Sequence, residues 1–467
     1  MDFSKEIENI KEKLGHGKSF DVVAKDIILP SMRRAVYFYI NGFANGEITV
    51  HIQKSLLSIV EEDISDAYRF AKRYIPYSEC TVTDSFDTAI YFVLSGAALL
   101  VVEGLSNYIV IDTRNYPKRG VEEPSNDKVL RGPREGFVEA LVPNIGLLRR
   151  RVRESELRIE KHTVGSGSKT DIAICYLDGV ADSTLIDNIR KRITGIKTKA
   201  VNMGLQSISE LIAGGKWYNP FPRVRYTERP DAAAAMIFEG SVILLCDNYP
   251  SAMILPTSFL DFTQDTDDFY FTPFLGGYLK LVRLSVYFLS LILTPVWFLL
   301  VLNPEVIPHW LDFIKPADQY NVPILLQLLS VEICIDGLKL ASLNTPDAMA
   351  NSLGIIGGLL LGDFAVNVGW LSNEVIFYMA FVAIANFTQP SYEMGYALKF
   401  MRMLTLVFIG LFSAIDLSVL GLIMGAVITV FLIVSTPVIP GSRGYLYPLI
   451  PWNGKAMKRL LFRAAAK

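Results

Sequence analysis

One uncharged apolar run, residues 284–302, constrains this 467-residue chain more than any other feature. A helix of this length, at about 1.5 Å per residue, is long enough to cross the roughly 30 Å hydrocarbon core of a bilayer. Apolar residues also crowd into the positions after this run, whereas the residues before it mix charged and apolar positions. The sequence therefore predicts a soluble N-terminal part followed by a helical membrane part.

Further apolar segments are expected to cross the membrane after this first one. They cover residues 323–341, 352–370, 375–389, 403–415 and 417–435. Several are short for a full crossing, which leaves half-helices as an alternative. We predict an all-α polytopic membrane domain of about six segments over residues 280–440.

Basic residues set the expected orientation, because cytoplasmic loops carry an excess of Lys and Arg. Lys280 and Arg283 precede the first segment, which places the soluble part in the cytoplasm. With six crossings, Lys399 and Arg402 fall in an inner loop, and the basic cytoplasmic tail over residues 441–467 is also inside. Omitting the second segment would place both loop cations outside, against this tendency.

The residues before the membrane part alternate short β-type runs with amphipathic helical stretches, which is typical of an α/β or α+β domain. We predict two cytoplasmic subdomains, over residues 1–154 and 155–279. Helices are expected over residues 84–96, 136–153 and 182–193, and strands over residues 97–103, 108–113, 170–177, 241–247 and 252–256. The apolar stretch 88–102 is shorter than a membrane span, so it is expected in a soluble core.

Composition and motifs exclude several classes of function. The formal net charge of −2 offers no basic field, so no nucleic-acid partner is expected. The cysteines Cys80, Cys175, Cys246 and Cys334 lack the short spacing of metal or redox motifs. The Gly-Lys-Ser at residues 17–19 resembles the end of a phosphate loop, but position 12 holds Glu rather than Gly and no strand precedes it. Without a hydrolase, zinc-protease or kinase motif, we expect no enzymatic activity, no cofactor and no metal site.

Three charged residues interrupt the second apolar segment. At about 100° per residue, Glu332, Asp336 and Lys339 share one stripe of a helix. Charges at membrane depth are costly and normally face a bundle interior or a water-filled cavity, so Glu332 and Asp336 are predicted to line an ion pathway. Repeated around an oligomer axis, they would form acidic rings that select cations. The alternatives are a structural ion set that pairs Asp336 with Lys339, or an interfacial helix.

The third segment carries small and polar residues at regular spacing. Gly354, Gly358 and Gly362 recur every four residues and predict a ridge for close helix packing. Asp363 and Asn367 form a polar pair on the same helix. We predict an ion-pathway role for this pair, with an interhelical hydrogen bond as the alternative.

A basic run closes the helix expected over residues 136–153. It contains Arg149, Arg150, Arg151 and Arg153, and cations suit the C-terminal end of a helix dipole. The run is expected to be a solvated helix end or an intersubunit ion-pair surface. Contact with anionic lipid headgroups is the alternative.

Long motifs in both parts of the chain resemble one protein family. They begin with Asp112-Thr113-Arg114-Asn115-Tyr116-Pro117 and Arg131-Gly132-Pro133-Arg134-Glu135-Gly136-Phe137-Val138-Glu139, with Asn144 and the arginines at 149–151. They continue with Asn219-Pro220-Phe221-Pro222, Arg225-Tyr226-Thr227-Glu228-Arg229-Pro230-Asp231, Glu239-Gly240 and Asn321-Val322-Pro323-Ile324-Leu325-Leu326-Gln327. In this order the motifs resemble the A subunits of the spore germinant receptor (GerA) family over nearly the whole chain. The form of residues 225–231 indicates a branch other than the nutrient receptors.

This resemblance implies a place in the inner spore membrane of endospore-forming bacteria and a role in germination. The A subunits are expected to form ring oligomers, as pentamers, that act as ion channels and release monovalent cations. A member of the indicated branch would amplify the germination response together with a small multi-pass membrane partner and other germination membrane proteins. Membrane lipid is an implied contact, and residues 225–231 are an implied family site.

Two other functions fit the sequence less well. A secondary transporter would be expected to show inverted repeats, and the two halves of the membrane part show no such repeat. A non-conducting scaffold would organise germination proteins through the soluble part. Because the acidic stripe agrees with an ion pathway, we expect a channel-type subunit.

Overall fold

The computed structural model describes most of the chain. The described residues are 3–14, 16–17, 22–40, 44–59, 66–75, 79–114, 132–152, 154, 156–201, 203–316, 321–344, 354, 357–358, 362, 364–442 and 444–461. The chain divides into two compact units, Met1–Gly120 and Val121–Lys467, and each has its own architecture.

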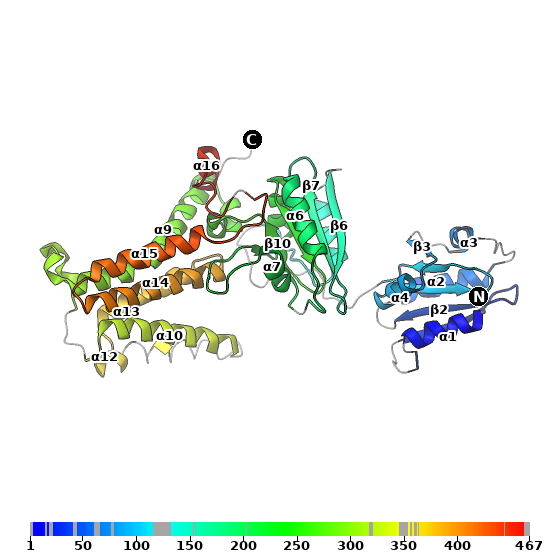
Figure 1. Ribbon diagram of the computed structural model, residues 1–467, viewed down its shortest axis with the longest axis horizontal. Helices are drawn as coiled ribbons and strands as arrows, with labels where there is room; N and C mark the ends of the chain where they lie inside the picture. The colour runs from blue at the N-terminus through cyan, green and yellow to red at the C-terminus, as the bar shows by residue number, and fades with distance from the viewer. Residues whose placement is uncertain are drawn as a thin grey trace. The chain divides into compact units, whose positions relative to one another are not determined.

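The first unit is a five-stranded sheet between two helical layers (Figure 1). Its strands are β1 (Val22–Ile28), β2 (Arg34–Ile40), β3 (Cys80–Thr83), β4 (Ala98–Val102) and β5 (Tyr108–Ile111). Its helices are α1 (Phe3–Leu14), α2 (Gly46–Leu57), α3 (Ala67–Tyr74) and α4 (Phe86–Leu94). The strand order is β1-β2-β4-β5-β3, and every neighbouring pair is antiparallel.

Alternation along the strands gives this sheet two apolar faces. Because successive side chains of a strand point to opposite faces, Tyr37 packs with α2 and α3, while Val36 and Phe38 pack with α1 and α4. Helix α4 and the β4–β5 hairpin confirm the elements predicted for this region. The apolar stretch 88–102 lies in this core, with Val93 fully buried, as expected.

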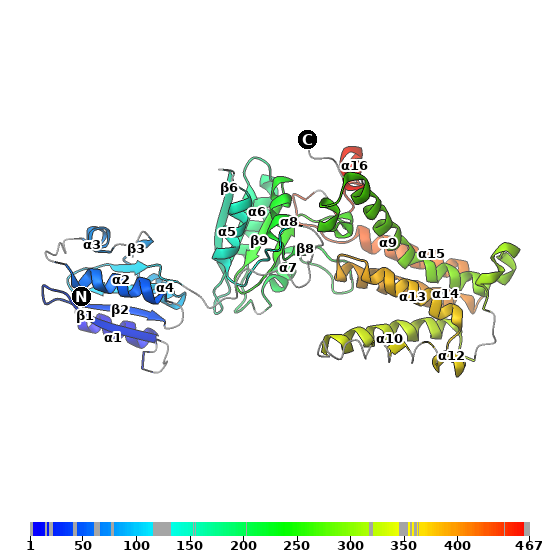
Figure 2. The same cartoon turned by 180° about the vertical axis from the view of Figure 1, so that it is seen from behind.

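The second unit begins with another five-stranded antiparallel sheet. Its strands are β6 (Leu157–Val164), β7 (Thr170–Leu177), β8 (Arg225–Thr227), β9 (Val242–Cys246) and β10 (Ala252–Leu255), in the order β6-β7-β9-β10-β8. Helices α5 (Leu141–Arg151) and α8 (Pro230–Phe238) cover one face, and α6 (Ser183–Thr194) and α7 (Leu205–Ala213) cover the other (Figure 2). Asp182 caps α6, because its side chain accepts hydrogen bonds from the N–H groups of Thr184 and Leu185.

The division between the two sheet domains comes earlier than the predicted boundary after residue 154. Helix α5, which was expected to close the first subdomain, packs Leu141 and Leu148 against the second sheet together with α8. No local sequence pattern indicates that α5 packs on the second sheet. The arginines at the end of α5 are instead typical of an exposed linker. The mixed α/β character of the N-terminal part is as predicted.

Helices make up the remainder of the second unit. The longer ones are α9 (Pro273–Leu302), α10 (Ile324–Asn344), α13 (Asn373–Phe387), α14 (Tyr392–Ser413) and α15 (Ser418–Val434). The shorter ones are η1 (Phe259–Thr263), η2 (Thr266–Phe269), η3 (Pro304–Val306), η4 (His309–Ile314), α12 (Ala365–Asn367) and α16 (Gly454–Leu461). Helix α14 packs against both α9 and α15.

Among the described helices, α9 and α14 are long and apolar enough to cross a membrane. Helices α13 and α15 are apolar but have only 15 and 17 residues, and α10 contains three charges. Large apolar side chains are exposed on these helices, among them Phe288, Phe377 and Phe431, as a membrane-facing surface requires. Six crossings stay a prediction, and of the segment expected over residues 352–370 only 354, 357–358, 362 and 364–370 are described.

After α15 the chain returns to the second sheet domain. Ile439 enters the apolar core that α6 and α7 form with the sheet. The Asn188 side chain donates a hydrogen bond to the Pro440 carbonyl at 2.9 Å, and the Phe259 N–H donates to the Tyr445 carbonyl at 2.7 Å. The helical part is therefore attached to this sheet domain both before α9 and after α15.

Candidate functional site

Four charged side chains, named here the charged cluster, lie between α10 and α14. Glu332 and Asp336 come from α10, and Lys399 and Arg402 come from α14. Spacings of four and three residues put each pair on one face of its helix. The exposed fractions are 1% for Glu332, 3% for Lys399 and 0% for Arg402, so three of the four members are buried.

Every member of the charged cluster has a counter-charge. Arg402 pairs with Glu332, with Nε 2.9 Å from Oε1. Lys399 Nζ lies 3.0 Å from Glu332 Oε2 and 2.7 Å from Asp336 Oδ2, so it bridges both carboxylates. Two carboxylates and two cations make the charged cluster formally neutral, which lowers the cost of placing it among apolar helices.

Arg402 also attaches α9 to the charged cluster. Its Nη1 donates a hydrogen bond to the Ser290 carbonyl at 2.6 Å. Pro295 lies inside α9, where it has no N–H to donate and its ring disturbs the preceding turn. From α14, the Arg402 guanidinium therefore contacts both α10 and α9.

The structure corrects one prediction and one alternative interpretation of these charges. Lys399 and Arg402 lie within α14 rather than in a loop, because ion pairs with α10 offset the cost of cations in an apolar helix. Asp336 pairs with Lys399 and not with Lys339, whose Nζ lies 4.7 Å from the centre of the Phe387 ring. The orientation argument that treated Lys399 and Arg402 as loop residues therefore fails.

The predicted ion-pathway residues differ in accessibility. Glu332 faces α14 of its own chain, whereas the Asp336 side chain is 32% exposed. Asp336 Oδ1 has no hydrogen-bond partner within the described part of the chain. Asn367 is exposed at the end of α12, and Asp363 lies outside the described residues. Asp336 is therefore the most exposed member of the charged cluster.

Among the described residues, the three glycines predicted to form a packing ridge make no close contact with another segment of the chain. A Cβ added at Gly354, Gly358 or Gly362 would meet no described atom of a neighbouring segment within 4 Å. Instead, a Cβ added at Gly421 would lie 2.6 Å from backbone atoms of α14. At Gly421, therefore, α15 lies close to the backbone of α14.

The motif at residues 225–231 builds a second polar site. The buried Arg229 side chain donates hydrogen bonds to the Pro133 carbonyl at 2.9 Å and to Asp231 Oδ2 at 2.7 Å, and the Tyr270 hydroxyl donates to the same carboxylate oxygen. Burial opposes ionisation of Asp231, but the hydrogen bonds from Arg229 and Tyr270 outweigh it and hold the Asp231 pKa below its usual range. Burial and the Asp231 carboxylate raise the pKa of Tyr270 to about 12. The site fixes the segment before α9 to the second sheet domain.

The remaining motif residues connect neighbouring segments. Pro230 begins α8, where its missing N–H costs no helical hydrogen bond. The Glu228 carbonyl accepts a hydrogen bond from the Phe137 N–H at 2.8 Å, which joins two motifs that are distant in sequence. The Arg225 side chain donates a hydrogen bond to the Gln264 carbonyl at 3.2 Å, and the Tyr226 hydroxyl donates one to Gln206 Oε1 at 3.1 Å. The Thr227 hydroxyl accepts a hydrogen bond from the Arg229 N–H at 3.2 Å.

The arginines that end α5 pair within their own chain. Glu135 accepts hydrogen bonds from Arg150 at 3.1 Å and from Arg151 at 2.9 Å. Arg153 lies outside the described residues, and the structure leaves the Arg149 side chain undescribed. Intrachain pairs thus account for two of the four arginines without a lipid or a second subunit.

Asn219 joins the second sheet domain to the end of α15. Its Nδ2 donates hydrogen bonds to the Leu432 carbonyl at 3.0 Å and to Thr436 Oγ1 at 3.1 Å. Its Oδ1 accepts a hydrogen bond from the Phe221 N–H at 3.0 Å. Because the last carbonyls of a helix lack helical partners, Asn219 satisfies one of them and anchors α15 at the same time.

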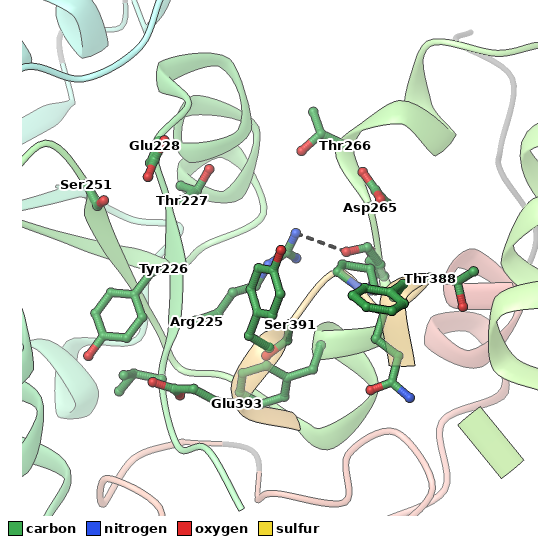
Figure 3. Close-up of a pocket in the computed structure, with 17 residues that line it drawn as sticks. Arg225, Tyr226, Thr227, Glu228, Ser251, Asp265, Thr266, Thr388, Ser391 and Glu393 are labelled. Atoms are coloured by element: carbon green, nitrogen blue, oxygen red, sulfur yellow. Dashed lines mark hydrogen bonds between the residues drawn. The ribbon is translucent and has the colours of Figure 1, made fainter. Parts of the chain in front are cut away.

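A polar pocket of about 420 Å³ lies between the second sheet domain and the turn from α13 to α14 (Figure 3). Arg225, Tyr226 and Glu228 line it from the β8 side. Gln389 and Glu393 line it from the helical side. The sequence motif at residues 225–231 indicates only one wall of this pocket. The other wall, at residues 387–393, is more than 150 positions away, and no local pattern connects the two.

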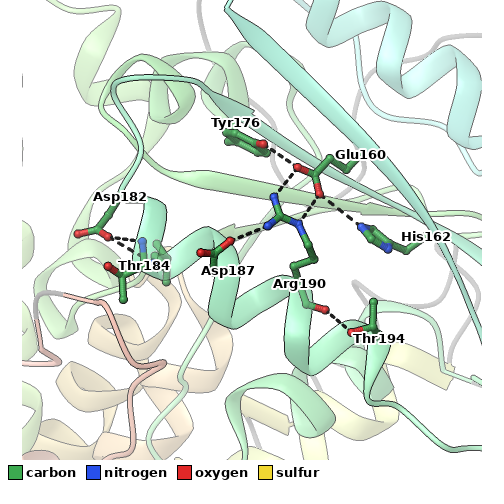
Figure 4. A network of polar contacts seen from close by, with 9 residues as sticks. Glu160, His162, Tyr176, Asp182, Thr184, Asp187, Arg190 and Thr194 are labelled. Atoms are coloured by element: carbon green, nitrogen blue, oxygen red, sulfur yellow. Dashed lines mark hydrogen bonds and ion pairs between the residues drawn. The ribbon is translucent and has the colours of Figure 1, made fainter.

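A polar network crosses β6, β7 and α6 on the second sheet (Figure 4). Glu160 accepts hydrogen bonds from Arg190 at 2.7 Å and from the Tyr176 hydroxyl at 2.6 Å. The bond from Arg190 lowers the Glu160 pKa to about 2, against the opposing effect of burial. All partners belong to one sheet domain, so this network stabilises the fold.

Comparison with known proteins gives consistent matches along the chain. The family profile described as "Bacillus/Clostridium GerA spore germination protein" matches residues 8–467. "Stage V sporulation protein AF" of Bacillus subtilis (strain 168) is 36% identical over 464 residues, covering 99% of this chain and 92% of that protein. "Spore germination protein KA" of the same organism is 27% identical over 474 residues, covering 98% and 84%. The crystal structure of the N-terminal domain of the A subunit of the Bacillus megaterium spore germinant receptor GerK3 matches at 24% identity with a TM-score of 0.23, over 55% of this chain and 95% of that one.

Proposed function

This chain belongs to the Bacillus/Clostridium GerA spore germination protein family, and we propose that it is a membrane subunit of the germination apparatus that releases monovalent cations. The similarity to stage V sporulation protein AF agrees with the branch that residues 225–231 indicate. The observation that carries the proposal is the charged cluster. Ionisable side chains buried among apolar membrane helices are costly, and they commonly mark ion pathways.

Within this proposal, Glu332 and Asp336 have different roles. Both Glu332 carboxylate oxygens are engaged, one by Arg402 and the other by Lys399, so Glu332 holds α10 against α14. The Asp336 side chain is 32% exposed, so Asp336 is the carboxylate of the charged cluster that faces the cation path. Copies of Asp336 around one axis would attract cations and repel anions.

The proposed location, oligomeric state and partners are those that membership of the GerA family leads us to expect. The chain acts in the inner spore membrane as a homo-oligomeric ring, with five subunits expected, and its N-terminal domains and C-terminus face the spore core. A small multi-pass membrane partner and other germination membrane proteins act with it. Its role is to amplify the germination response.

Potassium leakage from growing bacteria that produce the chain tests conduction, with and without the small partner. At matched membrane levels, Asp336→Asn is expected to lower the potassium leak by roughly tenfold, because every subunit of the ring loses its negative charge at once. Glu305→Gln is the control, since Glu305 is an exposed carboxylate on η3 outside the charged cluster. No leak from wild type with its partner, above that of empty cells, would contradict conduction.

A non-conducting scaffold is the second candidate. It is favoured by the pairing of both carboxylates within one chain, which is what a purely structural ion set would show. In that case Asp336→Asn would leave germination unchanged while the protein still accumulates in the membrane. Measuring leak and germination on the same variants separates the two functions.

A further inference from the structure

The part of the chain after α15 is strongly basic and contains the short helix α16. Between positions 441 and 467 there are six Lys and Arg residues and no Asp or Glu. Asn453 caps the start of α16, because its Oδ1 accepts a hydrogen bond from the Ala456 N–H at 3.1 Å. No side chain of this segment can therefore neutralise its positive charge.

Helical spacing separates basic from apolar positions in α16. At about 100° per residue, positions 455, 458 and 459 fall within an arc of about 100°, and all three hold Lys or Arg. Positions 456, 457, 460 and 461 fall on the opposite side and hold Ala, Met and Leu. In the structure, Lys455 and Lys458 are exposed, whereas Ala456 and Met457 are half-buried. The helix is therefore basic and amphipathic, a pattern typical of segments that lie on a membrane surface.

Large apolar side chains immediately before α16 are also exposed. The exposed fractions are 43% for Leu449, 65% for Ile450 and 70% for Trp452. A single exposed apolar side chain is ordinary, but three within four positions beside a basic helix form a local patch. Trp is enriched where a membrane meets water, because its ring is apolar and its N–H is polar. The patch and the cations together suit the interfacial layer of a bilayer.

The position of α16 in the fold agrees with this layer. Helix α16 contacts α9, and Figures 1 and 2 show it beside the N-terminal end of α9. At about 1.5 Å per residue, the 30 residues of α9 span about 45 Å, more than the roughly 30 Å hydrocarbon core. The uncharged run of α9 begins at residue 284, so its first turns lie at the level of the lipid headgroups. Tyr278, 57% exposed on these turns, is typical of that level.

The length of α16 indicates that it needs a covering surface. A helix of eight residues is marginal on its own in water. Contact with α9 leaves Ala456 and Met457 only half-buried. A second copy of the same tail would bring further positive charge, whereas an anionic bilayer offers both negative charge and an apolar layer.

We infer that α16 and residues 449–452 form a membrane-surface anchor that binds anionic lipid headgroups. Ile450 and Trp452 enter the interfacial layer, and Lys455 and Lys458 lie against the headgroups. The anchor holds the C-terminal segment at the bilayer surface beside the start of α9. The inference requires that the helical part lies in a membrane, and it does not require conduction.

Hydrogen exchange on the full-length chain in lipid nanodiscs tests this contact. Discs of phosphatidylcholine alone are compared with discs that contain equal parts of phosphatidylcholine and phosphatidylglycerol, an anionic lipid. We expect the amides of residues 454–461 to exchange more slowly in the anionic discs, because lipid contact opposes local unfolding of α16. High salt is expected to remove the difference, because it screens the attraction between exposed charges.

A double substitution removes charge from the anchor. In anionic discs, Lys455→Gln/Lys458→Gln is expected to speed exchange over residues 454–461 roughly 25-fold, because each cation near an anionic surface strengthens binding by about fivefold. The same variant is expected to match wild type in phosphatidylcholine discs. Lys5→Gln/Lys13→Gln is the matched control, since it removes two exposed cations from α1 of the other unit and is expected to leave this exchange unchanged.

Quenching by brominated phosphatidylglycerol locates the Trp452 ring. The chain contains five Trp residues, so the contribution of Trp452 is found by comparing wild type with Trp452→Phe. We expect the brominated lipid to quench a larger share of the fluorescence of wild type than of Trp452→Phe. The Phe side chain keeps an apolar ring at this position, so the anchor remains in place.

Three results would overturn the inference. They are equal exchange of residues 454–461 in the two kinds of disc, equal exchange of wild type and Lys455→Gln/Lys458→Gln in anionic discs, and equal quenching of wild type and Trp452→Phe. Slow exchange that is equal in both kinds of disc would indicate that a protein surface covers α16 instead. Because no leak is measured, failure of the anchor and failure of the conduction proposal remain distinguishable.

Discussion

Arg402 of α14 contacts both α10 and α9 in the helical part of the chain. Its counter-charge Glu332 is 1% exposed, so Glu332→Gln leaves a guanidinium buried without full compensation. We expect a loss of about 3–5 kcal/mol in the free energy of unfolding, the usual result of breaking a buried ion pair. Denaturant unfolding of the purified chain in detergent measures this loss.

Glu305→Gln provides the comparison for that experiment, because substitutions at exposed sites usually change stability by less than about 0.5 kcal/mol. A Glu332→Gln loss no larger than that of Glu305→Gln would show that Arg402 does not depend on its partner. The ion pair would then be unimportant for folding.

Glu160 makes stability depend on acid pH. Its pKa falls from the ordinary 4.5 to about 2 in the folded chain, mainly through Arg190. A carboxyl group with a lowered folded pKa stabilises fully above 4.5 and loses this contribution as the pH falls toward 2. We expect the gap in melting temperature between wild type and Glu160→Gln to be constant above pH 4.5 and to narrow below it. A gap independent of pH would contradict the pKa shift.

At the residue scale, sequence periodicity located the charges but not their partners. The helical spacing of Glu332 and Asp336 placed them correctly on one face of α10. Their partners Lys399 and Arg402 follow Glu332 by 67 and 70 positions, and no local pattern connects residues so far apart. Lys339, three positions from Asp336, is the partner that local spacing offers as the alternative, but Asp336 pairs with Lys399.

At the element scale, the α14–α15 contact depends on Gly421. A Cβ there would lie 2.6 Å from backbone atoms of α14, and a backbone cannot move aside as a side chain can. We expect Gly421→Ala to lower the free energy of unfolding by about 1–3 kcal/mol, as overpacking does. Unfolding in detergent measures this change.

Gly358→Ala is the matched control, since its Cβ would meet no described atom of a neighbouring segment. We expect it to leave the stability of a single chain unchanged or slightly raised, because Ala favours helix more than Gly does. Equal losses for both variants would contradict the assignment of the close contact to α14 and α15.

Helix boundaries show what hydropathy can and cannot find. The apolar segment 403–415 led to a short predicted crossing, whereas α14 begins at Tyr392 and runs for 22 residues. Lys399 and Arg402 lower the hydropathy of its first half, and only the ion pairs with α10 make that half compatible with an apolar setting. By contrast, strands β7, β9 and β10 were predicted closely because their apolar runs end at turn residues.

At the scale of the whole molecule, Asn219 connects the sheet domain to the end of the helical part. Asn219→Ala removes the hydrogen bonds to Leu432 and Thr436 and leaves the Phe221 N–H without its acceptor, at a cost of about 1–3 kcal/mol. We expect faster amide hydrogen exchange over residues 436–442. Thr436→Val, which removes only one of the two bonds, should give a smaller increase. Unchanged exchange in Asn219→Ala would contradict the anchoring role.

The order of the domains could be predicted from the sequence, but the contacts between segments that are far apart in the chain could not. Composition separates the mixed N-terminal part from the helical part, since apolar residues gather after position 284. The attachment of α5 to the second sheet, and of Ile439 to the same domain, depends on packing between segments far apart in the chain. Amphipathic patterns reveal an apolar face, but not which distant surface covers it.

The return of the chain to the second sheet domain limits how the helical part can be threaded through a bilayer. A chain that leaves a domain on one side of a bilayer and returns to the same domain must cross the bilayer an even number of times. Helix α9 departs from the second sheet domain, and Ile439 and Tyr445 rejoin it. Odd numbers of passes are therefore excluded, and a segment that enters the bilayer without crossing must turn back to the face it came from.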